Sequence, residues 1–346
     1  MLPLRRHPVR VLIIEPRLEH RGRGNLTTTR RWAEGLTARG IDVVTAASQN
    51  AEELEGQSFD LVHAHHAGRS GPAGLRLARR HRMPLVVSSG GTDIRGPRAF
   101  TPEVKDVLRH ADLVISPFNS DAECIAGALG APIPFAVVPR GIPAGAAPTP
   151  PEDPRADRWL FSGGLRDVKD PLLAVRIAEA ARRAGFDVAL DLYGPAIDES
   201  LLPVLENTLA SSPDRYRGEA PPDTMSDIYE SHDLLINSSL SEGASNSILE
   251  AWRSGLVVLA RRVPGNIEML SGAPSEIAFL FDEGNLLDPP MRAWLAAAAR
   301  NRRANARRAW EHVRTHHSEK LEIDALLTGY RRATSRGRSE SGPRGA

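Results

Sequence analysis

The sequence predicts an α/β fold with two halves, each built on a parallel sheet, and three observations lead to this prediction. The chain has 346 residues, which is more than one typical hydrophobic core accommodates. Short apolar runs alternate with helical patterns, as in parallel sheets whose strands are connected by helices. Residues 144–157 are rich in Pro and Ala, cannot form a core, and separate two such series.

The same pattern predicts the domain boundaries. We expect an N-terminal domain over residues 1–143, a linker over residues 144–157 and a C-terminal domain over residues 158–330. Residues 331–346 carry almost no apolar side chains and are predicted to be a disordered tail. Six strands are expected in the first half, at residues 9–15, 41–47, 59–64, 84–89, 111–116 and 135–138. Six more are expected in the second half, at residues 158–162, 187–194, 216–219, 234–236, 256–260 and 277–281, followed by helical residues 290–330.

Composition narrows the class of protein. Hydrophobic residues make up 41% of the chain and charged residues 25%, as in soluble globular proteins. The formal net charge of +1 gives no bulk attraction to nucleic acid, so no nucleic-acid partner is expected. A single cysteine, Cys124, excludes a disulfide within the chain. We also expect no signal peptide and no transmembrane helix, and predict a cytoplasmic location.

A loop rich in glycine and positive charge follows the first strand of the second half. It contains, in order, Gly163, Gly164, Arg166, Lys169 and Pro171. The glycines bring backbone N–H groups to the surface, and the proline is suited to begin a helix. Arginine grips a diphosphate through two hydrogen bonds, and lysine supplies a point charge. The loop is therefore predicted to bind a diphosphate; a solvated pair of surface cations is the alternative.

Residues 234–260 are predicted to form a strand, a polar loop, a helix and a second strand. Gly243, Ala244, Ser245 and Asn246 lie where the helix begins, and free backbone N–H groups there attract an anion. Glu242 lies in the loop, and Glu250 follows eight residues later, about two helical turns along. One carboxylate near the anion and another deeper along the axis suit a nucleotide sugar. An ordinary crossover with two solvated glutamates is the alternative.

The first half also carries polar groups at its strand ends, where α/β folds place ligands. Gly24 and Asn25 follow the first strand, in a turn that precedes a helix with threonines at its cap; a plain turn is the alternative. The glycine pattern is an incomplete dinucleotide fingerprint, which disfavours NAD. His63, His65 and His66 end the third strand, without the spacing of a zinc site. Asp93 follows Gly90 and Gly91 after the fourth strand.

These motifs resemble a known family. Glu242-Gly243 with Glu250-Ala251, followed by a glycine, a strand and Pro264-Gly265-Asn266, is similar to the E-x7-E region of retaining glycosyltransferases of family 4 (glycosyltransferase group 1). The resemblance implies the GT-B fold, in which two Rossmann-like domains face each other across a cleft. The runs GGTD (residues 90–93) and GLRDVKDP (residues 164–171) are similar to a subgroup that includes glycosyltransferase 1 domain-containing proteins and selenosugar synthases.

The resemblance also implies roles for particular residues. The catalytic residues it implies are His65, Glu242, Arg166 and Lys169, with His63 as the alternate histidine. The donor-binding residues it implies are Gly24, Asn25, Asp93, Gly163, Gly164, Arg166, Lys169, Gly194, Gly243, Ala244, Ser245, Asn246 and Glu250. No metal and no cofactor are expected; the co-substrate is a nucleotide-diphosphate sugar, with a UDP-sugar favoured by family habit.

Alternatives remain open at this point. The same fold with an inorganic nucleophile would make a chalcogen sugar, although residues 243–246 depart from the Gly-Gly-Ala-His run of selenosugar enzymes. A non-catalytic nucleotide-sugar binder and an NAD-dependent oxidoreductase are less favoured. The short basic helix predicted at residues 74–82 allows a weak peripheral membrane contact, with a solvated face as the alternative. The sequence does not set the sugar, the acceptor or the oligomeric state.

Overall fold

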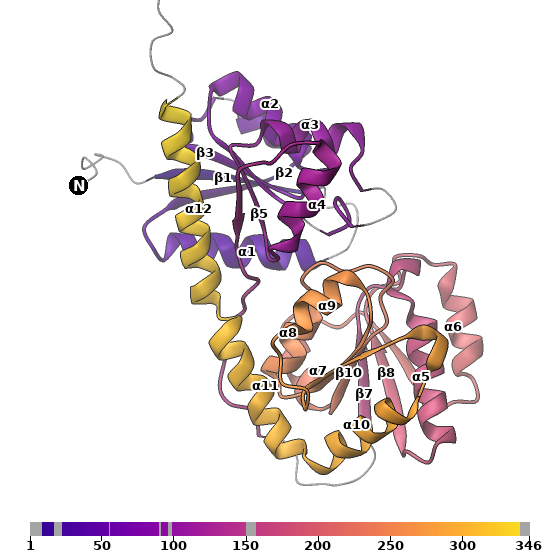
Figure 1. Cartoon of the computed structure of the whole chain (residues 1–346). Helices are drawn as coiled ribbons and strands as arrows, with labels where there is room; N and C mark the ends of the chain where they lie inside the picture. Colours follow the sequence, from indigo (N-terminus) through magenta and orange to yellow (C-terminus); the bar gives the residue numbers. More distant parts are fainter. Residues whose placement is uncertain are drawn as a thin grey trace, which may run out of the picture. The chain divides into compact units, whose positions relative to one another are not determined.

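The computed structural model describes residues 9–16, 23–54, 56–89, 91–95, 99–149 and 157–339. The chain divides into two compact units (Figure 1). Unit 1 consists of Met1–Arg140 together with Glu319–Ala346, and unit 2 consists of Gly141–Ser318. Each unit contains one six-stranded sheet with helices against it, so the predicted α/β class with two halves is confirmed.

The sheet of unit 1 is parallel, with strand order β2-β1-β3-β4-β5-β6. Its strands are β1 (Arg10–Glu15), β2 (Asp42–Ala47), β3 (Leu61–His65), β4 (Leu85–Ser88), β5 (Leu113–Ser116) and β6 (Phe135–Val137). Its helices are α1 (Arg23–Thr37), η1 (Ala51–Leu54), α2 (Gly71–His81), α3 (Pro102–His110), α4 (Ser120–Leu129) and α12 (Glu319–Ser339).

Both faces of this sheet are covered, which explains why its strands are continuous apolar runs. Leu12 and Ile14 face a core that includes α2 and α3, whereas Val11 and Ile13 face a core that includes α1 and α12. The two sets alternate along β1 because successive side chains of a strand point to opposite faces.

The sheet of unit 2 is also parallel, with strand order β12-β11-β10-β7-β8-β9. Its strands are β7 (Asp157–Ser162), β8 (Val188–Tyr193), β9 (Arg215–Gly218), β10 (Leu234–Asn237), β11 (Val257–Arg261) and β12 (Ala278–Phe281). The elements between and after them are η2 (Asp167–Lys169), α5 (Pro171–Arg183), α6 (Leu201–Leu209), α7 (Met225–Glu230), α8 (Asn246–Arg253), α9 (Pro264–Leu270), η3 (Glu283–Asn285), α10 (Pro289–Arg300) and α11 (Arg302–His316).

The end of the chain differs from the prediction. Residues up to 330 were expected in the second domain, but the contacts assign Glu319 onward to unit 1. The reason is the apolar face of α12, where Ile323, Leu326 and Tyr330 are buried in the core that also contains Trp32. The helix continues to Ser339, so the predicted tail does not begin at residue 331; residues 340–346 lie outside the described part of the chain.

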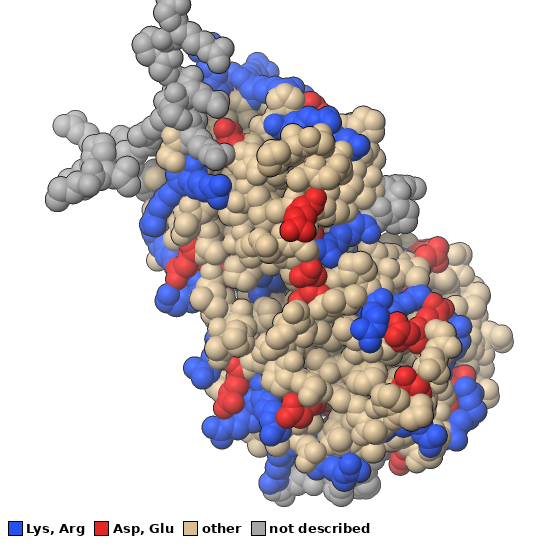
Figure 2. Space-filling view, viewed as in Figure 1, with Lys and Arg blue, Asp and Glu red and all other residues tan. Residues whose placement is uncertain are grey.

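The charges on the surface and the apolarity of the helices are relevant to the predictions about nucleic-acid and membrane partners. Figure 2 shows basic and acidic side chains interspersed on the face in view, as the net charge of +1 suggests. Within the described ranges, no helix combines the length and apolarity needed to span a bilayer. The expected absence of a nucleic-acid partner, the weak membrane contact and the cytoplasmic location stay predictions.

Candidate functional site

Two loops of unit 2 are tied together at the carboxyl ends of β7 and β10. We call residues 163–170 the glycine loop and residues 237–245 the acidic loop. The Ser238 hydroxyl donates to the backbone oxygens of Lys169 and Asp170, at 2.9 and 2.8 Å. The backbone N–H of Leu240 donates to the backbone oxygen of Val168 at 2.9 Å. These bonds hold the predicted diphosphate loop against the loop that carries Glu242.

A cation and a carboxylate pair between these two loops. Lys169 Nζ lies 2.5 Å from Glu242 Oε1, and the two side chains are 18% and 9% exposed. Burial by itself raises the pKa of Glu242, but the Lys169 charge and hydrogen bonds from Lys169, Ser239 and Asn237 outweigh it, so the pKa is lowered. Glu242 is therefore an ionised acceptor at neutral pH. The structure brings together two residues that are 73 positions apart in the sequence.

Close backbone contacts explain the glycines near the glycine loop. Gly194 has a φ of +147°, and a Cβ at this position would lie 2.0 Å from the backbone oxygen of Gly163. Only glycine fits there, because both the backbone conformation and the contact exclude a side chain. At Gly164 a Cβ would approach the Ile197 side chain to 2.4 Å. Gly194 thus sets how closely the loop after β8 approaches the glycine loop.

Arg166 and the start of α8 complete this part of unit 2. Arg166 is half-buried in the glycine loop, three residues before Lys169, with extended backbone. Gly243, Ala244 and Ser245 lie in the acidic loop, and α8 begins at Asn246. Glu250 is therefore about one turn into the helix rather than the two turns expected, because the helix begins later than its motif. Contact of these residues with a ligand stays a prediction.

Glu250 lies beside a buried tyrosine. Burial, followed by the negative charge of Glu250, raises the pKa of the Tyr229 hydroxyl well above its ordinary value. Tyr229 belongs to α7 and is completely buried. Glu250 is therefore near enough to Tyr229 for its charge to act on the hydroxyl.

His63 has a structural environment in unit 1. Its Nδ1 lies 2.8 Å from the Tyr330 hydroxyl and its Nε2 lies 2.6 Å from Ser88 Oγ, so both ring nitrogens have partners. The ring stacks on Trp32 with centroids 5.1 Å apart. Burial lowers the pKa of His63 to about 3, so the ring is neutral at physiological pH. These contacts join β3 to α1, β4 and α12.

Replacing Tyr330 by phenylalanine tests this structural role. We expect a loss of about 1–3 kcal/mol in the free energy of unfolding, because one buried nitrogen of His63 loses its partner. Any ligand binding by unit 2 is expected to stay unchanged. Urea denaturation measures the first effect and calorimetry the second; an unchanged unfolding midpoint would show that the hydrogen bond contributes nothing.

His65 has a different environment. The residue is 2% exposed, and among the described residues no hydrogen-bond partner reaches its Nδ1. Its ring meets the edge of Trp32, with centroids 4.9 Å apart. Burial, together with the positive charges of Arg140 and Arg31, lowers the pKa of His65 well below its ordinary value. His65 is therefore a neutral imidazole, unsuited to donating a proton as an imidazolium at neutral pH.

Asp93 anchors a loop of unit 1. Its Oδ2 accepts the backbone N–H of Ala67 at 2.7 Å and lies 3.5 Å from His66 Nδ1. His66 has a φ of +92°, a conformation that only glycine adopts without strain. Asp93 is 2% exposed, so it holds the turn between β3 and α2. Its predicted contact with a donor stays a prediction.

The start of α1 corrects another expectation. Gly24 and Asn25 were expected in a loop, with the following threonines as helix caps, but α1 begins at Arg23 and includes both residues in its first turn. Thr28 and Thr29 are buried inside the helix, and the Thr29 hydroxyl donates to the Glu15 carboxylate. Because the helix begins at Arg23, the threonines lie inside it and cannot cap its start. The side chain of Asn25 lies outside the described part of the chain.

Comparison with known proteins identifies the family of the chain. A model of Glycosyltransferase Family 4 matches residues 2–146, and a model of Glycosyl transferases group 1 matches residues 156–298, so the two together cover most of the chain. The chain belongs to the family 4 and group 1 glycosyltransferases.

Individual relatives agree with this family. The Xenopus tropicalis glycosyltransferase 1 domain-containing protein 1 is 32% identical over 179 residues, 49% of each chain, so the match spans about half of that relative. Sucrose-phosphate synthase from Thermosynechococcus elongatus has a similar fold, with a TM-score of 0.78 at 14% identity over 95% of this chain and 100% of that one. Anabaena HepE in complex with UDP-glucose gives a TM-score of 0.73 at 14% identity, over 92% and 99% of the two chains. The structural matches confirm the GT-B fold class.

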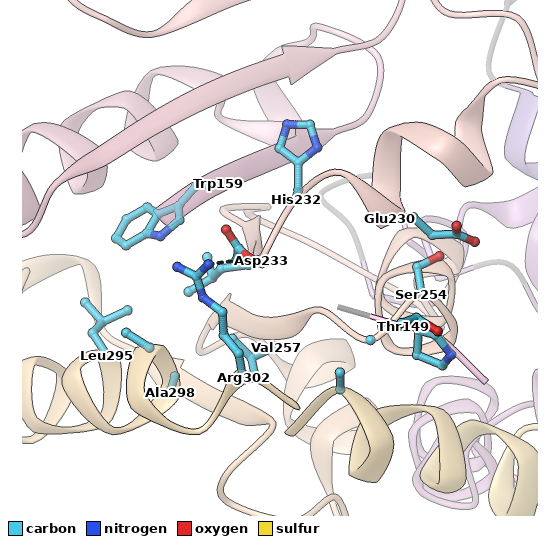
Figure 3. Close-up of a pocket in the computed structure, with 15 residues that line it drawn as sticks. Thr149, Trp159, Glu230, His232, Asp233, Ser254, Val257, Leu295, Ala298 and Arg302 are labelled. Carbon is cyan, nitrogen blue, oxygen red and sulfur yellow. Dashed lines mark ion pairs between the residues drawn. The ribbon is translucent and has the colours of Figure 1, made fainter. Parts of the chain in front are cut away.

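One described cavity of this glycosyltransferase lies away from the motif residues. It occupies about 50 Å³ and is lined by Trp159, His232, Asp233 and Arg302 among others (Figure 3). Asp233 and Leu234 precede and begin β10, so the cavity lies at the amino ends of the strands. Ligands of open α/β sheets bind beyond the carboxyl ends, which favours the glycine and acidic loops as the site. The Arg302–Asp233 ion pair, at 3.2 Å, contributes to the cavity wall.

Sequence reasoning missed several residues that shape the site of this glycosyltransferase. Asn237 and Ser238 were noted only as part of a small polar turn, and Asn266 only as part of a motif. The structure shows that these side chains connect the two loops and α9. Polar residues directly after an apolar strand were the available signal. Within the described ranges no group of three His, Cys, Asp or Glu side chains is placed to hold a metal ion, and the absence of a metal stays a prediction.

Proposed function

We propose that the chain is a retaining glycosyltransferase that transfers a sugar from a nucleoside-diphosphate sugar to an acceptor without a metal ion. The observation that carries this proposal is the pairing of Lys169 with Glu242 where the glycine and acidic loops meet. A cation for the diphosphate and an ionised acceptor for sugar hydroxyls lie side by side at the carboxyl ends of the sheet. Family membership supports the reaction class, and the resemblance of the E-x7-E region supports retention.

The chemistry requires charge stabilisation at two places. When the bond from the anomeric carbon to the diphosphate oxygen breaks, negative charge grows on the leaving diphosphate and positive charge on the sugar. Lys169, Arg166 and the backbone N–H groups at the start of α8 would stabilise the diphosphate, each such donor contributing on the order of 3 kcal/mol. The Glu242 carboxylate would accept hydrogen bonds from hydroxyls of the transferred sugar and offset the positive charge that develops on that sugar. Glu250 would accept the ribose hydroxyls.

The pairing of Lys169 with Glu242 has a consequence for binding. The Lys169 ammonium group is paired with the Glu242 carboxylate, so a diphosphate must compete with that carboxylate for the ammonium group. A diphosphate carries more charge and more acceptor oxygens than one carboxylate. We therefore propose that donor binding transfers Lys169 from Glu242 to the diphosphate. The HepE complex with UDP-glucose suggests a UDP-sugar as the first donor to try.

Thermal stability across nucleoside diphosphates tests the donor site. We expect UDP to raise the unfolding temperature, because a ligand at a hundred times its Kd stabilises by about 2.7 kcal/mol. Release of nucleoside diphosphate from a panel of nucleotide sugars tests the reaction, with organic acceptors and selenophosphate in separate arms. EDTA is expected to leave turnover unchanged. Absence of both a thermal shift with every nucleotide and release from every nucleotide sugar would contradict the proposal.

A further inference from the structure

Glu242 is held in an asymmetric way. Its Oε1 accepts hydrogen bonds from Lys169 Nζ at 2.5 Å, Ser239 Oγ at 2.7 Å and Asn237 Nδ2 at 3.2 Å. Among the described residues, no donor reaches Oε2. One carboxylate oxygen is therefore saturated by the protein, and the other remains for a ligand.

Asn237 is the part of this arrangement with the most connections. It ends β10, is 5% exposed, and its Nδ2 also lies 3.3 Å from Ser245 Oγ in the acidic loop. Its Oδ1 accepts the backbone N–H of Ser239 at 3.3 Å and Asn266 Nδ2 at 3.2 Å. Because Oδ1 has two donors facing it, the amide cannot rotate to exchange its oxygen and nitrogen without losing hydrogen bonds at both ends.

Asn266 holds the Asn237 amide in place through a hydrogen bond to Asn237 Oδ1. It belongs to α9, is completely buried, and its Nδ2 also donates to the backbone oxygen of Arg261 at 2.9 Å. The preceding residue, Gly265, lies so close to the acidic loop that a Cβ would be 2.0 Å from the backbone oxygen of Glu242. Thus α9 lies close against the backbone at Glu242 and reaches its side chain through the Asn266–Asn237 pair.

We propose that Asn237, held by Asn266, is a positioning residue that keeps Glu242 in place with Oε2 presented to the donor sugar while Lys169 transfers to the diphosphate. The inference rests on the proposed function. When Lys169 leaves, Oε1 keeps the hydrogen bonds from Asn237 and Ser239, so the carboxylate does not follow the ammonium group. With Asn237 in place, Glu242 can bind the sugar while Lys169 binds the diphosphate.

Replacing Asn237 by alanine is the central test. We expect kcat for nucleotide-sugar turnover to fall about 10- to 100-fold, because a misplaced catalytic group costs that much. Affinity for UDP alone, measured by calorimetry, is expected to stay within about twofold of wild type, since UDP contains no transferred sugar. Asn237→Gln, which keeps the donor on a longer side chain, is expected to recover part of the lost turnover. A general loss of folding would lower UDP binding and turnover together.

A second measurement does not depend on turnover. We expect the Glu242 carboxyl group, followed by 13C NMR in protein labelled at glutamate and assigned by the signal lost in Glu242→Gln, to titrate below its ordinary pKa in wild type. In Asn237→Ala the pKa should rise, because one hydrogen bond to the ionised form is gone. An unchanged titration and an unchanged kcat in Asn237→Ala would overturn the proposal.

The Asn266 variant and a control complete the test. Asn266→Ala is expected to lower kcat, and the double variant Asn237→Ala/Asn266→Ala should be no worse than Asn237→Ala alone, because the two residues act in series. Asn305→Ala removes another buried asparagine, on α11, and should change neither the Glu242 titration nor kcat. If wild type turned over no nucleotide sugar, the proposed function would fail, while the titration would still decide whether Asn237 holds Glu242.

Discussion

Replacing Lys169 by methionine is expected to lower kcat/KM for nucleotide-sugar turnover by about a hundredfold. Removing one preorganised donor to developing negative charge costs about 2.7–4 kcal/mol, and Lys169 is placed in the glycine loop for this role. Methionine keeps the length and apolar character of the side chain, so the comparison isolates the ammonium group. Release of nucleoside diphosphate at subsaturating donor gives the measurement.

The same variant affects stability, and this effect must be separated from catalysis. In the folded protein the pKa of Glu242 is lowered, so its ionisation adds stability above the ordinary value of 4.5, and this contribution is lost as the pH falls through the folded pKa. Without Lys169 the carboxylate stays buried with no counter-charge, and we expect a lower unfolding temperature at pH 7. The double variant Lys169→Met/Glu242→Gln removes both charges and should recover stability but not turnover.

Lys320→Met is the matched control. Lys320 is exposed on α12 and pairs with Asp324 on the same helix, at 2.6 Å. We expect its replacement to leave turnover at the wild-type level. If Lys169→Met retained full turnover, the glycine loop would have no part in the reaction, whatever its effect on stability.

Replacing Glu322 by leucine is expected to destabilise the protein by about 3–5 kcal/mol, because it leaves buried arginines without their carboxylate. Glu322 on α12 is completely buried; Arg31 Nε lies 2.9 Å from its Oε2, and Arg140 Nη1 lies 3.6 Å from its Oε1. Burial lowers the pKa of Arg140 to about 10, and Glu322 opposes that fall. Two cations therefore lie near one buried carboxylate within unit 1.

Urea denaturation followed by far-UV circular dichroism checks this expectation by comparing the unfolding free energies of the variant and the wild type. Asp324→Asn is the control on the same helix, two residues further along the chain. Its partners Lys320 and Arg39 are surface residues, so the unfolding midpoint should change little. An equal midpoint for Glu322→Leu and wild type would show that α12 does not depend on this cluster.

The strands were predictable because a parallel sheet covered on both faces needs apolar residues along its buried strands, and such runs can be seen in the sequence itself. Most of its strands are short apolar runs, and each of the twelve predicted strands corresponds to an observed one. The boundaries of helices were less predictable. The threonines after Gly24 favour a cap by residue type, but the helix begins at Arg23, and Thr29 lies inside it with its hydroxyl donating to the Glu15 carboxylate at the end of β1.

The candidate site also combines residues that could be identified from the sequence with contacts that could not. Arg166, Lys169, Glu242 and Glu250 were identified from motifs, since charge and glycine content are local properties. The contacts of Lys169 with Glu242, and of Asn237 with Asn266, join positions 73 and 29 residues apart. Such contacts depend on strand order, because β10 lies next to β7 on one side and β11 on the other.

By itself the sequence determined the two-sheet α/β class, the positions of the strands and the cationic and acidic loops, because apolar periodicity and charge act over a few residues. Only the tertiary structure decided that α12 belongs to unit 1, that Lys169 is paired with Glu242 and that the donors to Glu242 in the described part of the chain all reach one oxygen. These features depend on which segments pack together, and packing is set by side chains that are distant in the sequence and adjacent in space.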